Sequence, residues 1–224
     1  MALGRHNMEF QLDVYSDVIC PWCYVGMKRL EAALELLGRP SEVSIMWRPF
    51  ELNPTMPAFG MDRKTYLETK FGNSGAVESM LDHVRQAGRQ AGIAFAFDRI
   101  KKTPNTFEAH RLIWLAGREG RQGEVVERLF RGYFEEGMDL SDRSALAQAA
   151  SEAGIRQDNV AAWLDSTEGV DEVRAEEQRG LHLGIRGVPY FVVDGRLGLS
   201  GAQPPAVIAA WLREASVATV RSTR

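Results

Sequence analysis

The chain has 224 residues, 45% of them hydrophobic and 25% charged, and a formal net charge of −3 at pH 7. That length can bury one large core or two small ones. Charges of both signs are mixed along the chain, so no basic stripe indicates a nucleic-acid partner. No apolar run approaches the roughly 20 residues of a membrane span, and residues 1–7 lack the apolar core of a signal peptide. We therefore expect a cytoplasmic protein without nucleic-acid or membrane partners.

The first predicted elements surround the only two cysteines of the sequence. Residues 9–15 alternate between polar and apolar side chains, which predicts a strand. From Pro21 onward apolar residues recur at spacings of three and four until Gly38, which predicts a helix with a glycine cap. Proline is well tolerated at the first helical position because its missing N–H would have no partner there. Cys20 and Cys23 should therefore begin this helix about one turn apart, at a spacing that permits a disulfide.

The motif Cys20-Pro21-Trp22-Cys23 predicts dithiol chemistry. Unpaired N–H groups and the positive end of the helix dipole favour a thiolate at Cys20, and the thiolate is the attacking species. Cys23 lies deeper in the helix, so we assign it as the resolving thiol that attacks a mixed disulfide on Cys20.

Two alternative interpretations of the motif are weaker. A zinc site usually needs four ligands, and the sequence has no second cysteine pair and no evident histidine pair to supply them; the other alternative is a pair of inert thiols.

A second strand and a long helical region follow. Residues 43–48 alternate and end at Pro49, which predicts a strand, and the proline-containing stretch 50–60 predicts a connection. Beyond residue 61 strand patterns largely vanish, and glycines separate segments with helical periodicity. We expect these helices at residues 62–71, 76–91, 105–118, 124–136, 144–153 and 159–165.

Strand character returns near the end of the chain. After a helix expected at residues 170–183, residues 188–193 predict a strand, and Asp194-Gly195 is a strong hairpin signal. Residues 196–199 would form the return strand, and a last helix is expected at about residues 204–215. The order is therefore β-α-β, a helical block, and then α-β-β-α.

This order predicts an α/β fold with one interruption. The two flanks, residues 1–60 and 168–224, together contain the elements of a thioredoxin-like domain. Residues 61–167 would be an all-helical insertion that packs as a small subdomain against the sheet.

Four stretches of the sequence, taken in order, resemble the FrnE-like branch of the DsbA family: residues 16–26, 103–112, 187–192 and 200–204. The resemblance covers nearly the whole chain. It implies a thioredoxin fold with a helical insertion, and exchange with thiols and disulfides of proteins or small molecules. No metal or nucleotide cofactor is implied. It also implies a cis bond between Val188 and Pro189, which would place Pro189 beside the thiols and turn the Val188 backbone toward an extended substrate.

The helix that begins near Asn105 carries two polar residues on an otherwise apolar face. Asn105 and Glu108 fit a capping box at its start. His110 and Arg111 interrupt the apolar face, and one interpretation is that they face a cleft and bind a carboxylate, such as that of glutathione as a co-substrate. The alternative, which is the commoner case for buried polar groups, is that they are hydrogen-bonded at the subdomain seam. Trp22 is expected to be exposed, where it can contribute to substrate binding.

Three functions compete. The leading hypothesis is a thiol–disulfide oxidoreductase, with disulfide isomerisation as a second activity of the same thiols. The first alternative is a glutathione-dependent isomerase or transferase of the kappa or 2-hydroxychromene-2-carboxylate isomerase type. Such enzymes commonly carry serine at the position of Cys20 and need no second cysteine, so the presence of Cys23 argues against them. The second alternative is a redox-sensitive client-binding module, whose binding would survive the loss of both thiols.

Overall fold

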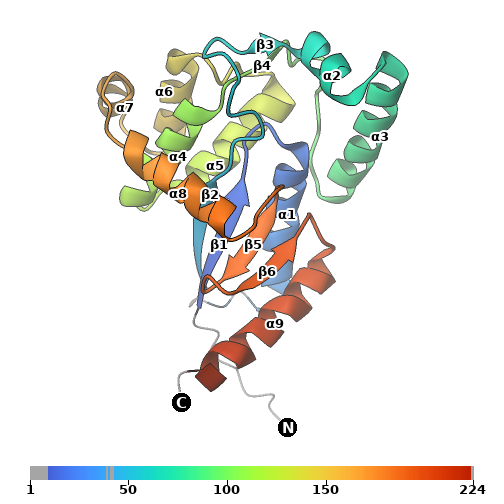
Figure 1. The fold of residues 1–224 in the computed structure, drawn as a ribbon, viewed down its shortest axis with the longest axis vertical. Coiled ribbons are helices and arrows are strands. Elements are labelled where there is room, and N and C mark those ends of the chain that lie inside the picture. Colours follow the sequence, from blue (N-terminus) through green and yellow to red (C-terminus); the bar gives the residue numbers. More distant parts are fainter. Residues whose placement is uncertain (1–9, 39, 41–42, 223–224) are drawn as a thin grey trace.

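The computed structural model describes residues 10–38, 40 and 43–222 (Figure 1). Glu9 of the first predicted strand and residues 1–7 lie outside the described residues. The described part combines a four-stranded sheet, helices on both of its faces, and a group of helices beyond one end of the sheet. This is the predicted thioredoxin-like fold with a helical insertion, and the fold class is confirmed.

The sheet has the strand order β2-β1-β5-β6. Strand β1 (Phe10–Ser16) runs parallel to β2 (Val43–Pro49) and antiparallel to β5 (Tyr190–Val193), which pairs with β6 (Leu197–Ser200). Parallel neighbours need a crossover connection, and helix α1 (Pro21–Leu36) supplies it between β1 and β2. All four strands were expected, β1 and β2 from their alternating patterns and β5 and β6 from the hairpin signal, with bounds that differ by a residue or two.

Different helices cover the two faces of the sheet. Helix α9 (Pro205–Ser222) packs along α1 on one face, and α8 (Val170–His182) lies over the other (Figure 1). Helix α8 comes close to β1 at Gly180, where an added Cβ would lie 2.7 Å from the Tyr15 ring. Only a residue without a side chain fits there. Tyr15 thus packs beneath α8, whereas its neighbour Val14 belongs to the main core that α1 shares.

The insertion holds the helices expected from the periodicity, with bounds shifted by a few residues: α2 (Arg63–Phe71), α3 (Ser74–Gln90), α4 (Phe107–Arg118), α5 (Gln122–Arg131), α6 (Arg143–Glu152) and α7 (Gln157–Leu164). One prediction needs correction. Residues 124–136 do not form a single α-helix, because α5 gives way to a π-helix, η1 (Gly132–Glu136). Within η1 the Phe134 carbonyl accepts a hydrogen bond from Ala96 N at 2.8 Å, a contact with another segment that local periodicity does not encode.

Two further local predictions were wrong. The insertion is not all-helical, because a small second sheet pairs β3 (Met61–Asp62) with β4 (Lys102–Thr103). Strands of two residues are too short to produce an alternating pattern in the sequence. Helix α4 starts at Phe107 with Thr106 as its N-cap, so Asn105 does not form a capping box. Instead, the Asn105 side chain accepts from Phe107 N at 2.9 Å and donates to the Met56 carbonyl at 2.8 Å, which ties the start of α4 to the connection after β2.

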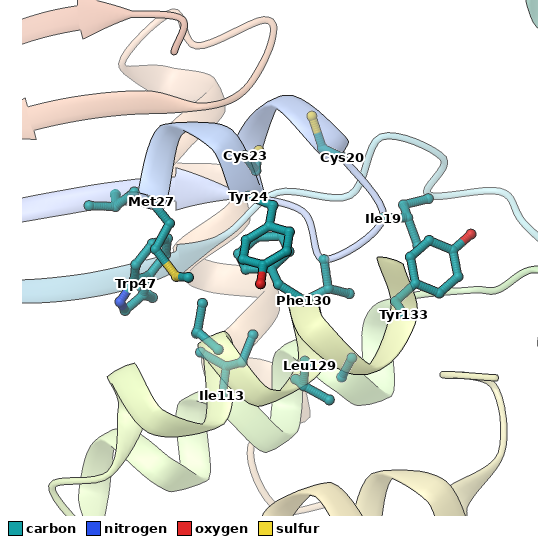
Figure 2. Packing of buried hydrophobic residues seen from close by; sticks show 14 of the residues in the cluster. Ile19, Cys20, Cys23, Tyr24, Met27, Trp47, Ile113, Leu129, Phe130 and Tyr133 are labelled. Atoms are coloured by element: carbon teal, nitrogen blue, oxygen red, sulfur yellow. The ribbon is translucent and has the colours of Figure 1, made fainter. Parts of the chain in front are cut away.

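The insertion is joined to the sheet by a shared core and by one amide side chain. Tyr24 of α1 stacks on Phe130 of α5, with ring centroids 5.2 Å apart (Figure 2). At the sheet edge, Gln122 accepts from Trp47 N at 2.8 Å and donates to the Trp47 carbonyl at 3.1 Å, as a neighbouring strand would. The core therefore runs without a break from one part to the other, and the division at residues 60 and 167 stays a prediction. No helix in the described part of the chain is long and apolar enough to cross a membrane.

Candidate active site

The two cysteines occupy the first turn of α1. Cys20 is the N-cap residue, with Pro21 directly after it in the first helical turn, and Cys20 N donates to the Asp17 carbonyl at 2.9 Å to form the turn that enters the helix. Cys20 is 5% exposed and Cys23 is fully buried, and the two free cysteines lie 3.4 Å apart. Figure 2 shows the Cys20 sulfur at the start of the helix and Cys23 one turn further in. The structure therefore places the two cysteines as predicted, with Cys20 at the start of α1 and Cys23 about one turn along.

The segment before β5 lies beside the first thiol. The Cys20 thiol donates to the Val188 carbonyl oxygen at an S-to-O distance of 3.6 Å, and the Val188–Pro189 peptide bond is cis. Gly26 of α1 makes this approach sterically feasible, because a Cβ there would lie 2.9 Å from Pro189 Cγ. Gly26 falls within the first of the four resembling stretches, but its role as a spacer between α1 and Pro189 emerged only from the structure.

The environment of Cys23 keeps its thiol protonated. Removal from water raises the pKa of the Cys23 thiol well above its ordinary value, and a hydrogen bond with Cys20 raises it further. A hydrogen bond with the Asp17 backbone lowers the pKa of Cys23, whereas the negative charge of Asp17 raises it. Cys23 therefore keeps its proton until a base removes it, which suits a thiol that reacts second.

Beside the thiols, one large aromatic side chain reaches solvent. Trp22 is 37% exposed, as expected. Val188, whose carbonyl accepts from the Cys20 thiol, is half-buried. Trp22, in the first turn of α1, and Val188 are therefore the partly exposed residues nearest to Cys20 that the sequence singled out.

The sequence and fold comparisons agree with this geometry. The model of the DSBA-like thioredoxin domain matches residues 11–213. The chain belongs to this family. A crystal structure of a probable DsbA oxidoreductase from Streptomyces coelicolor is 33% identical and superposes with a TM-score of 0.85, covering 92% of this chain and 90% of the other.

Two further comparisons are more distant, one with a solved structure and one with a protein sequence. The cytosolic disulfide reductase DsbM from Pseudomonas aeruginosa, solved with GSH, is 19% identical with a TM-score of 0.63 and coverage of 91% and 98%. The uncharacterized protein YwbO of Bacillus subtilis is 24% identical over 187 residues, which is 83% of this chain and 88% of that protein.

Arg111 of the DSBA-like protein does not face a cleft. Its side chain is 2% exposed and donates to the carbonyls of Ser166 at 2.9 Å and Glu168 at 2.7 Å, as well as to the Glu108 carboxylate at 2.7 Å. The guanidinium also lies over the Trp163 ring, 4.5 Å from its centroid. These contacts favour the structural interpretation of Arg111, in which it fixes the turn after α7 to α4.

His110 points into the protein beneath the thiol turn. It is 2% exposed, and its Nε2 lies 3.7 Å from Asp17 Oδ1. Asp17 is fully buried and accepts backbone hydrogen bonds from Ile19 at 3.3 Å and Leu52 at 2.7 Å. The predicted carboxylate partner of His110 is thus an internal aspartate, three residues before Cys20, rather than a ligand.

Two half-buried glutamates adjoin His110 and Asp17, and the sequence did not reveal that they meet. Burial and the charge of Glu177 together raise the pKa of Glu51 to about 7, against the opposing effects of His110 and Arg174. Burial likewise raises the pKa of Glu177, against the opposing effect of His110. Burial lowers the pKa of His110, but the Asp17 carboxylate, with help from both glutamates, raises it above its ordinary value overall. Glu51 follows β2 and Glu177 lies on α8, so no sequence spacing connects them.

A cavity of about 460 Å³ adjoins this group and is lined by residues that include Glu51, Met56, Asn105, Phe107, Arg143 and Arg174. Glu51 belongs to both the buried group and the cavity wall. Within the described residues no group of three or more His, Cys, Asp or Glu side chains is arranged to hold a metal ion.

Proposed function

We propose that this DSBA-like protein is a cytoplasmic thiol–disulfide oxidoreductase in which Cys20 is the nucleophile and Cys23 the resolving thiol. The Cys20 thiolate attacks a substrate disulfide, forms a bond to one sulfur and releases the other as a thiolate. Cys23 then loses its proton and attacks Cys20, which forms the internal disulfide and releases the reduced substrate. The observation that carries the proposal is the Cys20–Cys23 pair at the helix N-terminus, with Cys23 wholly buried behind Cys20.

The surroundings of Cys20 favour an extended or small substrate. Val188 and Pro189 would offer backbone contacts to a strand-like segment, and Trp22 would supply an apolar surface beside the attacked sulfur. His110 and Arg111 are not among the proposed substrate contacts, because both are buried and face internal groups. Since the DsbM structure holds GSH, glutathione is the first small thiol to test as a co-substrate.

The glutathione-dependent isomerase remains the alternative that shares the fold. A structure of 2-hydroxychromene-2-carboxylate isomerase is 15% identical with a TM-score of 0.65, which supports only the fold. The adjacent thiols favour disulfide exchange, because a second buried cysteine has no role in an isomerase that uses a single residue to orient glutathione.

The test is a disulfide assay with insulin and with scrambled ribonuclease, comparing the wild type with Cys20→Ser and Cys23→Ser. We expect Cys20→Ser to lose activity in both assays. Cys23→Ser should lose net reduction of insulin but keep part of the ribonuclease isomerisation, which needs only one attacking thiol. An inactive wild type that binds unfolded ribonuclease as well as both variants do would support a client-binding module instead.

A further inference from the structure

The cavity of about 460 Å³ lies where the insertion meets the sheet-bearing part of the chain, and neither Trp22 nor Val188 lines it. Its wall comes from the segment after β2, from the starts of α4 and α6, and from α8. Helix α4 contacts both α6 and α8, and the three helices gather on one side of the molecule (Figure 1). Cavities of this size at such junctions are common sites for small molecules.

Part of the wall is apolar. Met56 and Leu140 are buried and Phe107 is half-buried, and we call these three side chains the apolar wall. The neutral polar side chains beside them are already engaged. Asn105 bonds to the backbone of Met56 and Phe107, and the Ser141 hydroxyl donates within its own turn at 2.6 Å. A ligand in the cavity would therefore meet hydrocarbon on the apolar wall and would be held by other groups.

Two arginines supply those groups. The guanidinium of Arg174, on α8, lies over the Phe107 ring at 4.5 Å from its centroid, and within the described residues it makes no ion pair. Arg143, at the start of α6, pairs with Asp165 at 3.0 Å, but the two side chains are 54% and 78% exposed. Exposed pairs of this kind contribute little. Both guanidinium groups therefore keep N–H donors for a ligand.

The acidic side chains of the wall do not offset both arginines. The Glu108 carboxylate is held by the buried Arg111 at 2.7 Å. Burial and the charge of Glu177 raise the pKa of Glu51 to about 7, so Glu51 is only partly ionised near neutral pH. The wall thus favours an anion, and the planar fork of a guanidinium matches a planar anion such as a carboxylate.

We propose that this cavity binds a small organic carboxylate, whose carboxyl group is held by Arg143 and Arg174 and whose hydrocarbon part lies on the apolar wall. The site is separate from the thiols, and the proposal does not rest on the roles of Cys20 and Cys23. Inorganic phosphate fits less well, because it gains nothing from the apolar wall and its second charge is repelled more strongly by an ionised Glu51.

The experiment is a titration of the ¹⁵N-labelled protein, followed by NMR slightly below neutral pH. The probes are 3-phenylpropionate and hexanoate, for which we expect millimolar affinity. Three controls accompany them: 3-phenylpropanamide has the same shape without the charge, acetate lacks the hydrocarbon part, and inorganic phosphate lacks both the planarity and the hydrocarbon. The backbone amides that shift should centre on residues 105–108 and 140–143, and those of residues 20–23 and 188–190 should not move.

The variants test the proposed anchor. Arg174→Gln should weaken the binding of both probes by at least about tenfold, because hydrogen bonds from a charged donor are lost. Arg174→Lys keeps the charge without the fork, so its affinity should fall between those of the wild type and Arg174→Gln. Arg118→Gln is the matched control and should bind as the wild type does. Arg118 also lies over an aromatic ring, 5.2 Å from the centroid of Trp114, yet it does not line the cavity.

The pH dependence supplies a readout that a merely structural role of Arg174 would not produce. The charged groups around Glu51 are Asp17, His110, Glu177 and Arg174. Ionisation of Glu51 above about pH 7 adds a negative charge to the wall, so the affinity for both carboxylates should fall several-fold as the pH rises through this value. His110 also titrates, with its pKa raised above the ordinary value, but it does not line the cavity. Glu51→Gln should therefore remove most of this fall.

Several results would overturn the proposal. The absence of shifts with both probes would contradict it, as would equal affinity for the amide, for acetate or for phosphate, or shifts centred on residues 20–23 and 188–190. Unchanged affinity in Arg174→Gln, or an equal loss in Arg118→Gln, would do the same. If Arg174→Gln fails to fold, the comparison of 3-phenylpropionate with its amide and the pH dependence of the wild type decide. A protein that binds the carboxylates but exchanges no disulfides would support this site and refute the proposed function.

Discussion

Gly26 provides the sharpest test of how the site is assembled. In Gly26→Ala the added methyl group would lie 2.9 Å from Pro189 Cγ, 3.3 Å from Pro189 Cβ and 3.6 Å from Phe191 Cζ. The proline ring is rigid and Phe191 is fully buried, so α1 and the segment before β5 must move apart by several tenths of an ångström. Overpacking of this kind costs about 1–3 kcal/mol, and the better helix propensity of alanine offsets up to about 1 kcal/mol of it. The expected net loss of stability is about 1–2 kcal/mol.

The same displacement should affect chemistry more than stability. It widens the 3.6 Å contact between Cys20 and the Val188 carbonyl, and small misplacements near reacting atoms can reduce rates by up to about 100-fold. We expect insulin reduction to fall by about tenfold, with stability followed by urea unfolding. Gly123→Ala is the control, because a Cβ there meets nothing within 4 Å. If Gly26→Ala matches Gly123→Ala in both assays, α1 and Pro189 are not in the close contact that we describe.

Two further predictions concern the insertion and the half-buried Glu51. Gln122→Ala removes two hydrogen bonds to the backbone of Trp47. It should lower the free energy of unfolding, measured by urea unfolding, by about 1–3 kcal/mol. A change within about 0.5 kcal/mol, as for ordinary surface substitutions, would contradict the strand-like role of this side chain. Glu51 has a pKa of about 7 when folded, against an ordinary value of 4.5, so the native state holds more protons between these values and stability falls as pH rises through that window. Glu51→Gln should flatten this fall by on the order of 1 kcal/mol, since partial solvent exposure screens the effect, and thermal unfolding at several pH values would reveal an unflattened curve if the assignment is wrong.

Local patterns were sufficient for the elements that position the thiols. The alternation of β1, the apolar spacing of α1 and Pro21 at the helix start together placed Cys20 and Cys23, because each of these signals is contained within a few residues. The hairpin of β5 and β6 followed from its turn residues for the same reason.

Contacts between distant segments were not predictable in this way. Arg111 could equally have faced a ligand or the carbonyls of Ser166 and Glu168, and only the folded chain decides between them. Glu51 and Glu177 come from segments more than 100 positions apart in the sequence, and their polar character gave no sign that they meet. The position of His110 on the apolar face of α4 singled it out in the sequence, but that pattern did not show that its partner would be Asp17.

The most direct test of the central claim is to trap the mixed disulfide. Cys23→Ser and Cys20→Ser are each incubated with glutathione disulfide, and the intact proteins and their peptides are weighed by mass spectrometry. The account predicts that Cys23→Ser accumulates one glutathione on Cys20, because no resolving thiol remains, while Cys20→Ser stays unmodified since Cys23 is buried and keeps its proton. Modification of Cys23 in Cys20→Ser at the same rate, or no adduct in Cys23→Ser with either glutathione disulfide or DTNB, would contradict it.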